Sequence, residues 1–410
     1  MVERVGERPR GSSTICLPFS QEDYQRIIDD PQAFRTALDK AFFEMPELFP
    51  EAFAQGYTLK DSRQSENLGI RLRRIECKAT GEAFTVRPSF VLPYMAGLTK
   101  DVKHALFLRR FGVPFWALAH VFGKDADYWY RLTVSLGRNS VTGTTVRGAS
   151  LPDDLLADEH HQTIDGEKVY AATTVGEGCC LGAAISPTAD EEGLKEAYGV
   201  FKQEAQNIDK DYQPKTVNAD GWPATRSSWR ALFVAIVVVR CFLHGWLSIR
   251  DRGKHLKELF KTLADKVWSA FRAENKRTLA QRLRRLRQWA QENLTGPVLE
   301  QVLKLCNRSK EYQDALDHPG CHRTSNMLDR VMRQMNRYFD AGQHLHGSLQ
   351  AAELHCRAWA LLYNFAPWSP ASAKSNQGYK CPAERLNQHR YHDDWLENLL
   401  ISASLAGFRR

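Results

Sequence analysis

The sequence predicts an α/β protein built on a mixed β-sheet, with an all-helical insertion and a helical unit before the sheet. Three observations support this prediction. Residues 151–249 alternate short apolar runs with amphipathic segments, residues 256–303 repeat apolar residues at helical spacing, and residues 99–138 form three short apolar patterns separated by glycines. A chain of 410 residues, 43% hydrophobic and 25% charged, is long enough for two or three domains with proper cores.

The net charge of +8 favours a polyanionic partner, and nucleic acid is the leading class. A solvated basic surface without a partner is the alternative. The first 14 residues lack the apolar core of a signal peptide, and no stretch reaches membrane-spanning length, so we expect a cytosolic protein without membrane contact. The nine scattered cysteines are expected to be reduced thiols.

Residues 1–60 are expected to form a helical arm, with helices over 21–28 and 31–43, and Ser20 as the first cap. A β-hairpin region is predicted over residues 61–98, because alternating apolar residues flank a turn at residues 79–82. Cys77 stands alone there, and no metal site is expected around it.

Residues 99–138 show the helix breaks and caps typical of a helix-turn-helix DNA-binding domain. The breaks are at Gly112 and Gly123, and the cap is at Asp125 or Asp127. Its third helix, residues 126–136, would enter the major groove, although a plain helical domain would show the same pattern. The residues expected to reach phosphates or base edges are Lys124, Tyr128, Tyr130, Arg131 and Arg138. The small, polar residues 139–150 read as a linker.

The first part of the predicted catalytic core spans residues 151–249. The expected strands are 153–164, 168–174, 179–186, 216–220 and 234–239, with helices over 190–208 and around Trp229 and Phe233. The β-branched run VAIVVV favours a strand, and its shortness and the following Arg240 exclude a membrane span. This order, with Asp158 on the first strand and Asp220 ending the fourth, is the topology of a ribonuclease-H-like core, and it places Asp220 at the carboxyl edge of the sheet.

A helical insertion is expected over residues 250–320, and the core resumes over 321–365 with a basic helix that carries Asp329. Residues 366–410 are expected to be a C-terminal tail, a loop followed by a short helix. One helix of the insertion carries four arginines, which would form either a cationic face for a DNA backbone or a solvated helix surface. They are Arg282, Arg284, Arg285 and Arg287.

Asp158, Asp220 and Asp329 are the candidate catalytic and metal-binding residues. Three carboxylates at one sheet edge would hold two Mg²⁺ or Mn²⁺ ions, since both ions prefer hard oxygen ligands. Two such ions a few ångströms apart suit the in-line transfer of a phosphoryl group.

These motifs resemble the core of Mutator-like DDE transposases and related bacterial insertion-sequence transposases. In that family a Cys-x-x-His pair follows the second Asp, as Cys241 and His244 follow Asp220, and the third acid follows a Thr-Ser/Thr-Asn stretch, as in residues 324–330. The resemblance covers about residues 154–365. It departs from the family at Asp329, where Glu is usual, and the fallback acids are Glu300 and Glu311 for the third position and Asp154 for the first.

The resemblance implies metal-dependent cleavage at transposon ends and strand transfer into target DNA. Its implied partner is double-stranded DNA, both terminal inverted repeats and target, bound by a homodimer or larger synaptic assembly at the bacterial nucleoid. Cys241 and His244 would shape the pocket beside the second Asp; without a second Cys/His pair close by, a zinc site is not expected. The remaining paired histidines, His160 with His161 and His344 with His346, are expected to be structural or solvent-facing.

Two other functions fit the same sequence. A domesticated, catalytically inactive descendant would bind DNA without cutting it. A related two-metal nuclease or recombinase would cut without joining.

Overall fold

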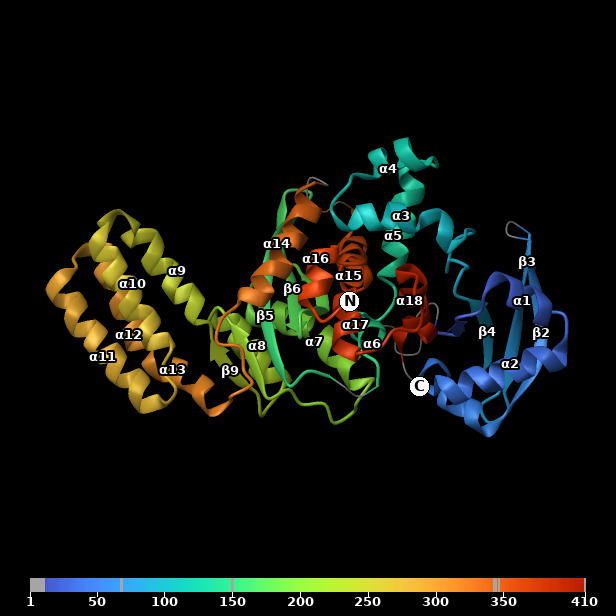
Figure 1. Cartoon of the computed structure of the whole chain (residues 1–410), viewed down its shortest axis with the longest axis horizontal. Helices are drawn as coiled ribbons and strands as arrows, with labels where there is room; N and C mark the ends of the chain where they lie inside the picture. Colours follow the sequence, from blue (N-terminus) through green and yellow to red (C-terminus); the bar gives the residue numbers. More distant parts are fainter. Residues whose placement is uncertain (1–11, 67–68, 149–150, 342–344, 346, 409–410) are drawn as a thin grey trace.

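Two separate β-sheets organise the chain. The computed structural model describes residues 12–66, 69–148, 151–341, 345 and 347–408. The central sheet lies between a helical module on one side and, on the other, a smaller sheet with its own helices, and a three-helix unit stands beside the central sheet (Figure 1). The mixed α/β class expected from the sequence is confirmed.

The central sheet has five strands in the order β7-β6-β5-β8-β9. The first three in sequence form an antiparallel meander, and the last two run parallel to β5 on its other side. The last strand starts later than expected: Val234 is 94% exposed, because pairing with β8 begins only at Val237. The strands are β5 (Asp154–Ile164), β6 (Glu167–Gly176), β7 (Cys179–Ser186), β8 (Thr216–Ala219) and β9 (Val237–Arg240).

Helices cover both faces of this sheet, which explains why its strands are apolar on both sides. Leu155 and Ala157 of β5 pack into the core formed with α7 and α8, whereas Leu156 packs into the core formed with α14 and α15. Successive residues of β5 therefore serve opposite faces. These helices are α7 (Glu191–Gln206), α8 (Pro223–Leu232), α14 (Asn326–Asp340) and α15 (Leu349–Phe365).

The expected linker over residues 139–150 is wrong for the residues that the structure describes. Residues 139–146 are buried, and Val141–Thr145 form the short helix α6. A Cβ atom on Gly143 would lie 1.9 Å from the carbonyl oxygen of Gly407. The small residues that suggested a linker are there because backbones approach closely.

An all-helical module separates β9 from α14, as expected. Its helices pack through one apolar core that includes Phe242, Leu283 and Val302. They are α9 (Phe242–Gly253), η3 (Lys254–Leu256), α10 (Glu258–Phe271), α11 (Lys276–Asn293), α12 (Gly296–Asn307), α13 (Ser309–Gln313) and η4 (Asp314–Asp317).

The helical arm expected over residues 1–60 and the hairpin region after it are in fact one α/β unit. Its four-stranded sheet has the order β1-β4-β3-β2, and β1 pairs parallel with β4. The hairpin of β3 and β4 is confirmed, but β1 and β2 were missed, because β1 has only four residues and β2 is mostly exposed. The elements are β1 (Thr14–Leu17), α1 (Gln21–Ile27), α2 (Pro31–Glu44), η1 (Pro46–Leu48), η2 (Glu51–Gln55), β2 (Tyr57–Ser65), β3 (Ile70–Cys77) and β4 (Ala83–Pro88).

Three helices follow, as the glycine breaks indicated: α3 (Thr99–Arg110), α4 (Phe115–Phe122) and α5 (Ala126–Leu136). Gly112 and Gly123 have positive φ angles of 85° and 74°, and the side chain of Asp125 accepts the amide of Tyr128 as an N-cap. The helices share one continuous core with the N-terminal sheet, α15 and the C-terminal segment.

The short last helix expected in the C-terminal tail is confirmed, but the segment is not an exposed tail, because this helix is mostly buried. Ser404 donates a hydrogen bond to the carbonyl of Leu48 and accepts one from the amide of Cys16, which joins the C-terminal segment to the N-terminal sheet. The elements are α16 (Pro370–Ser375), α17 (Pro382–Asn387), α18 (Trp395–Ser402) and η5 (Ser404–Gly407). In the described part of the chain, no helix combines the length and apolar character needed to cross a membrane.

Candidate functional site

Asp158 and Asp220 are brought together by the register of three neighbouring parallel strands. Leu156 of β5 pairs with Asn218 of β8, so two residues further on Asp158 lies level with Asp220. The strands lie about 4.8 Å apart, and both side chains fall on the face covered by α14 and α15. Ala219 pairs with Arg240 on β9, which places Cys241 next in the same row.

Asp158 is held in an environment that opposes its ionisation. Burial, Glu159 and Asp220 raise the pKa of Asp158 to about 7, against the weaker lowering effect of His244. One of its carboxylate oxygens accepts the amide N–H of Glu159 at 3.0 Å. Strongly perturbed pKa values of this kind are more frequent at functional sites than elsewhere in a protein.

The carboxylate of Asp220 is fixed by the turn that follows β8. One of its oxygens accepts the amide N–H of Trp222 at 2.6 Å, and Gly221 between them has φ of 97°. This φ favours glycine, and a Cβ atom on Gly221 would lie 2.5 Å from the guanidinium of Arg240, which would then have to shift. The turn formed by Gly221, Trp222 and Pro223 therefore fixes the orientation of the Asp220 carboxylate.

Cys241 and His244 adjoin the two carboxylates from the start of α9. Interaction with Cys241 raises the pKa of His244 to about 9, burial opposes this, and Asp158 and Asp220 add to it. Burial raises the pKa of Cys241, but His244 outweighs it, and the thiol pKa is lowered. The expectation that this pair lies beside the second Asp matches the geometry, and His244 supplies positive charge to the acidic pair.

The segment before α14 closes this edge of the sheet. The side-chain amide of Asn218 donates to the carbonyl of His322 at 2.7 Å, and the amide of Phe242 donates to the carbonyl of Arg323 at 3.1 Å. Two buried polar atoms beside the site, Oδ1 of Asn218 and Nδ1 of His244, have no hydrogen-bond partner. Buried polar groups are seldom left unpaired, so these two atoms are open to a water molecule or a ligand.

Asp329 lies in the first turn of α14, one residue after the buried Leu328. Helix α14 packs on β5, on the face that carries Asp158, and Asp329 is partly exposed at its flank. Among the described residues, no three His, Cys, Asp or Glu side chains stand close enough together to hold a metal ion. The fold therefore assembles two of the three expected acids and places the third on the covering helix.

The fallback acids are held elsewhere. Glu311 forms salt bridges with Arg240 at 2.8 Å and Arg226 at 3.5 Å, and Glu300 is exposed on α12. Asp154 begins β5, about 13 Å along the strand from Asp158, and accepts the hydroxyl of Thr216 at 2.6 Å.

Sequence reasoning overlooked Glu159, a buried carboxylate on the opposite face of β5. It accepts hydrogen bonds from the hydroxyls of Tyr198 and Thr225, both at 2.7 Å, and burial raises its pKa. The alternation of strand side chains gives the signal: a residue adjacent to Asp158 must face α7 and α8. Glu159 connects the helix layer below the sheet to the strand that carries Asp158.

The residues expected to contact DNA from α5 are unequally available. Lys124 and Arg131 are exposed, and Arg131 pairs with Asp127 at 3.0 Å. Tyr130 packs edge-on against Phe115 and is partly buried, and Tyr128 and Arg138 are also partly buried. Helix α5 also packs against α15, where the ring of Tyr130 contacts that of His355.

The arginines expected to form a cationic face on α11 divide into two pairs. Arg284 and Arg285 are exposed. Arg282 donates to the carbonyl of Ser269 at 2.5 Å, and Arg287 donates to Asn307. Two of the four therefore support helix packing.

The histidines that were expected to be structural divide similarly. His160 stacks on Phe339 of α14 with ring centroids 6.3 Å apart, and His161 is exposed near Tyr170. His344 and His346 lie outside the described residues.

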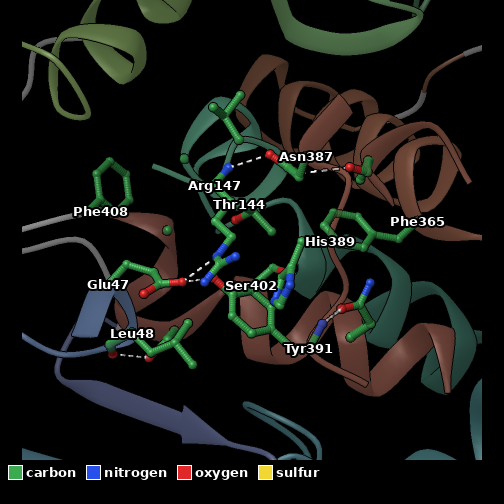
Figure 2. A pocket seen from close by; sticks show the side chains of 16 residues that line it. Glu47, Leu48, Thr144, Arg147, Phe365, Asn387, His389, Tyr391, Ser402 and Phe408 are labelled. Atoms are coloured by element: carbon green, nitrogen blue, oxygen red, sulfur yellow. Dashed lines mark hydrogen bonds and ion pairs between the residues drawn. The ribbon is translucent and has the colours of Figure 1, made fainter. Parts of the chain in front are cut away.

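A small hollow far from the acids lies where the N-terminal unit, α6 and the C-terminal segment meet (Figure 2). Arg147 forms a salt bridge with Glu47 at 2.6 Å across it, and Tyr391 donates a hydrogen bond to the same carboxylate at 2.7 Å. Its volume of about 20 Å³ accommodates about one water molecule. We interpret it as a polar junction between units.

Comparison with protein-family models finds none that matches this chain. Comparison with curated proteins likewise finds no match.

Proposed function

We propose that this protein is a DNA transposase that cuts at the ends of a mobile element and joins them to target DNA with the help of divalent metal ions. The observation that carries the proposal is the juxtaposition of Asp158 and Asp220 on adjacent parallel strands, at the carboxyl edge of the central sheet.

The strand order and the helical module support the same proposal. An antiparallel meander followed by two strands parallel to the first is the order of a ribonuclease-H-like core. The helical module lies between Asp220 and α14, which is where the transposases that this sequence resembles carry their insertion. The net charge of +8 suits a DNA substrate.

The donor set at the sheet edge fits Mg²⁺ or Mn²⁺. The carboxylates of Asp158 and Asp220 lie close enough to interact electrostatically, and a neutral oxygen, Oγ of Ser325, is buried near Cys241. Asp158 and Asp220 would hold the metal. Asp329 of α14 is the third ligand that we propose, although in this structure it does not group with the other two acids. When bound, two ions supply Lewis-acid stabilisation of the attacking and leaving oxygens of a phosphodiester.

The protein's own part is to orient the ligands. The N–H groups of Glu159 and Trp222 fix one oxygen of Asp158 and one of Asp220, which leaves the other oxygens of each carboxylate available. His244 places positive charge beside both acids and lowers their mutual repulsion. Such fixed positions reduce the reorganisation needed during reaction.

The test is magnesium-dependent nicking and strand transfer on DNA that carries the element's terminal inverted repeats. Asp158→Asn and Asp220→Asn should each lower both activities by at least about a thousandfold, since each removes a metal ligand. Asp154→Asn is the matched control, because it alters an acid at the amino end of the same strand, about 13 Å from Asp158. Cleavage that survives Asp220→Asn, or needs no divalent ion, would contradict the proposal.

Cleavage and joining are scored separately. Cleavage without joining would identify a nuclease, and tight DNA binding without cleavage would identify an inactive descendant. Asp329→Asn compared with Glu311→Gln tests the third acid: only the former should abolish nicking, because Glu311 is committed to Arg240 and Arg226.

A further inference from the structure

A hollow of about 460 Å³ lies on the three-helix unit, between helix α5 and the loop before α3. This volume is within the range of small-ligand sites, roughly 300–1,000 Å³. Three aromatic side chains and two cations are among the residues that line it: Tyr94, Tyr128, Tyr130, Arg131 and Arg138.

Four of these residues, from Tyr128 to Arg138, were expected to read the major groove of a duplex. A recognition helix reads base edges by projecting a convex face into the groove. Here the same side chains line a concave surface, and α5 is packed against α15 through contacts that include Tyr130 and His355. This geometry suits a flat ring that enters the hollow better than a duplex laid across it.

The chemistry of the hollow matches an unpaired nucleotide. Aromatic rings stack on nucleobases, and arginines neutralise the flanking phosphates. The guanidinium of Arg138 lies 5.1 Å from the ring centre of Tyr94. Arg131 is paired with Asp127 in an exposed bridge, which is weak enough to be exchanged for a phosphate.

Tyr94 is presented by a strained backbone. Its φ of 64° lies in the left-handed region that bulky residues rarely adopt, and its side chain is at the surface, with 40% of the residue exposed. The loop is pressed against α5, since a Cβ atom on Gly97 would lie 3.4 Å from the hydroxyl of Tyr128. Strain of this kind persists where the surrounding structure over-determines it, typically at functional sites.

A second hollow, of about 300 Å³, continues on the other side of this loop, and Tyr94, Met95 and Ala96 line both. Arg87 lines the second hollow. It is 7% exposed, and its Nε has no hydrogen-bond partner. The concave surface therefore extends past Tyr94 and includes a buried cation with an unused donor.

We propose that the hollow between Tyr94 and α5 binds an unpaired nucleobase of DNA, with Arg131 and Arg138 on the flanking phosphates. This inference rests on the proposed function and specifies the form of DNA that the three-helix unit recognises.

The test measures binding of the full-length chain to three fluorescein-labelled probes by anisotropy. The probes are a single strand of about 12 nucleotides, a duplex with one bulged base, and the same duplex fully paired. Tyr94→Ala should weaken binding of the first two by about tenfold or more, because one stacked base is lost. Tyr94→Phe, which keeps the ring, should retain wild-type affinity.

Phe43→Ala is the matched control, since Phe43 is an aromatic residue on α2 that is 88% exposed. It should leave all three affinities unchanged. If only binding of the single strand depends on Tyr94, the natural ligand is a frayed or nicked DNA end. If binding of the bulged duplex also depends on Tyr94, the natural ligand is an extruded base. Thermal melting of each variant verifies folding.

The inference is overturned if Tyr94→Ala binds the unpaired probes as tightly as wild type, or if the fully paired duplex depends on Tyr94 equally. Asp220→Asn separates this from failure of the proposed function, because it should abolish cleavage and leave binding of the single strand intact. A wild-type protein that binds unpaired bases through Tyr94 but never cuts DNA would refute only the proposed function.

Discussion

Asp158→Asn should stabilise the metal-free protein at pH 8 while it abolishes activity. The rise in the pKa of Asp158 from 3.8 to about 7 means that the folded state holds its proton more tightly than the unfolded state. Stability is therefore lost as the pH rises from about 4 to about 7, and the loss is constant above that. At 1.36 kcal/mol per pKa unit, the loss is about 4 kcal/mol.

Asparagine keeps the shape of the side chain and an acceptor for the amide of Glu159, but it cannot ionise. The variant should gain up to about 4 kcal/mol over wild type at pH 8 and almost nothing at pH 4. The attraction to protonated His244 is already included in the pKa of about 7, so it does not reduce this gain further. Stability traded for activity in this way is common at functional sites.

The assay is urea denaturation in EDTA at both pH values. Asp153→Asn is the control, because Asp153 is exposed and pairs with Lys215 at the amino end of β5, where the change should be within about 0.5 kcal/mol. Magnesium should then stabilise wild type, by about 2.7 kcal/mol at a hundred times its Kd, and leave Asp158→Asn unchanged. A variant no more stable than wild type at pH 8, or equally stabilised at pH 4, would refute the reasoning.

Three further predictions concern the surroundings of the site and the junctions between units. Cys241→Ala should lower the pKa of His244 from about 9 toward 6.5, since Cys241 is the main cause of the rise; NMR titration of the imidazole measures this, and an unchanged value would contradict it. Burial raises the pKa of Glu47, but hydrogen bonds from Arg147 and Tyr391 outweigh this effect, and the pKa is lowered in the folded protein. Ionised Glu47 therefore stabilises the fold above pH 4.5, and this stabilisation is lost as the pH falls through the lower pKa of the folded state. Glu47→Gln should therefore flatten the acid limb of a stability-against-pH curve, and an unaltered limb would count against the junction. Gly143→Ala should destabilise the fold by more than about 2 kcal/mol in denaturant melts, because the new methyl group would lie 1.9 Å from a carbonyl oxygen; a neutral result would mean that the backbones can separate.

The sequence was sufficient where the signal is local. Strands β5 to β8, the helix between β7 and β8 and the helices α10, α11, α12, α14 and α15 follow from apolar periodicity, since each buries its own face. Even the closeness of Asp158 and Asp220 could be anticipated, because β5 and β8 are parallel neighbours and Asp220 follows the carboxyl end of β8.

Tertiary contacts decided the rest. Small residues in 139–146 read as a linker because their composition is the same whether they are exposed or, as here, pressed against another backbone. Strand β1 has four residues and gains its stability from pairing with β4, some seventy residues later in the chain, a contact that periodicity cannot reveal.

The sequence already shows the residue types of the site: an acid within one strand, an acid at the end of another, a Cys-x-x-His pair and a third acid on a basic helix. What folding alone determined is their environment. Side chains are desolvated, carboxylates of the same charge come close together and polar atoms lose their partners only when β5, β8, α9 and α14 meet. The pKa of Asp158 therefore depends on distances between residues that are far apart along the chain. The same holds for Tyr94, an ordinary loop residue in the sequence that the packed structure turns outward beside α5.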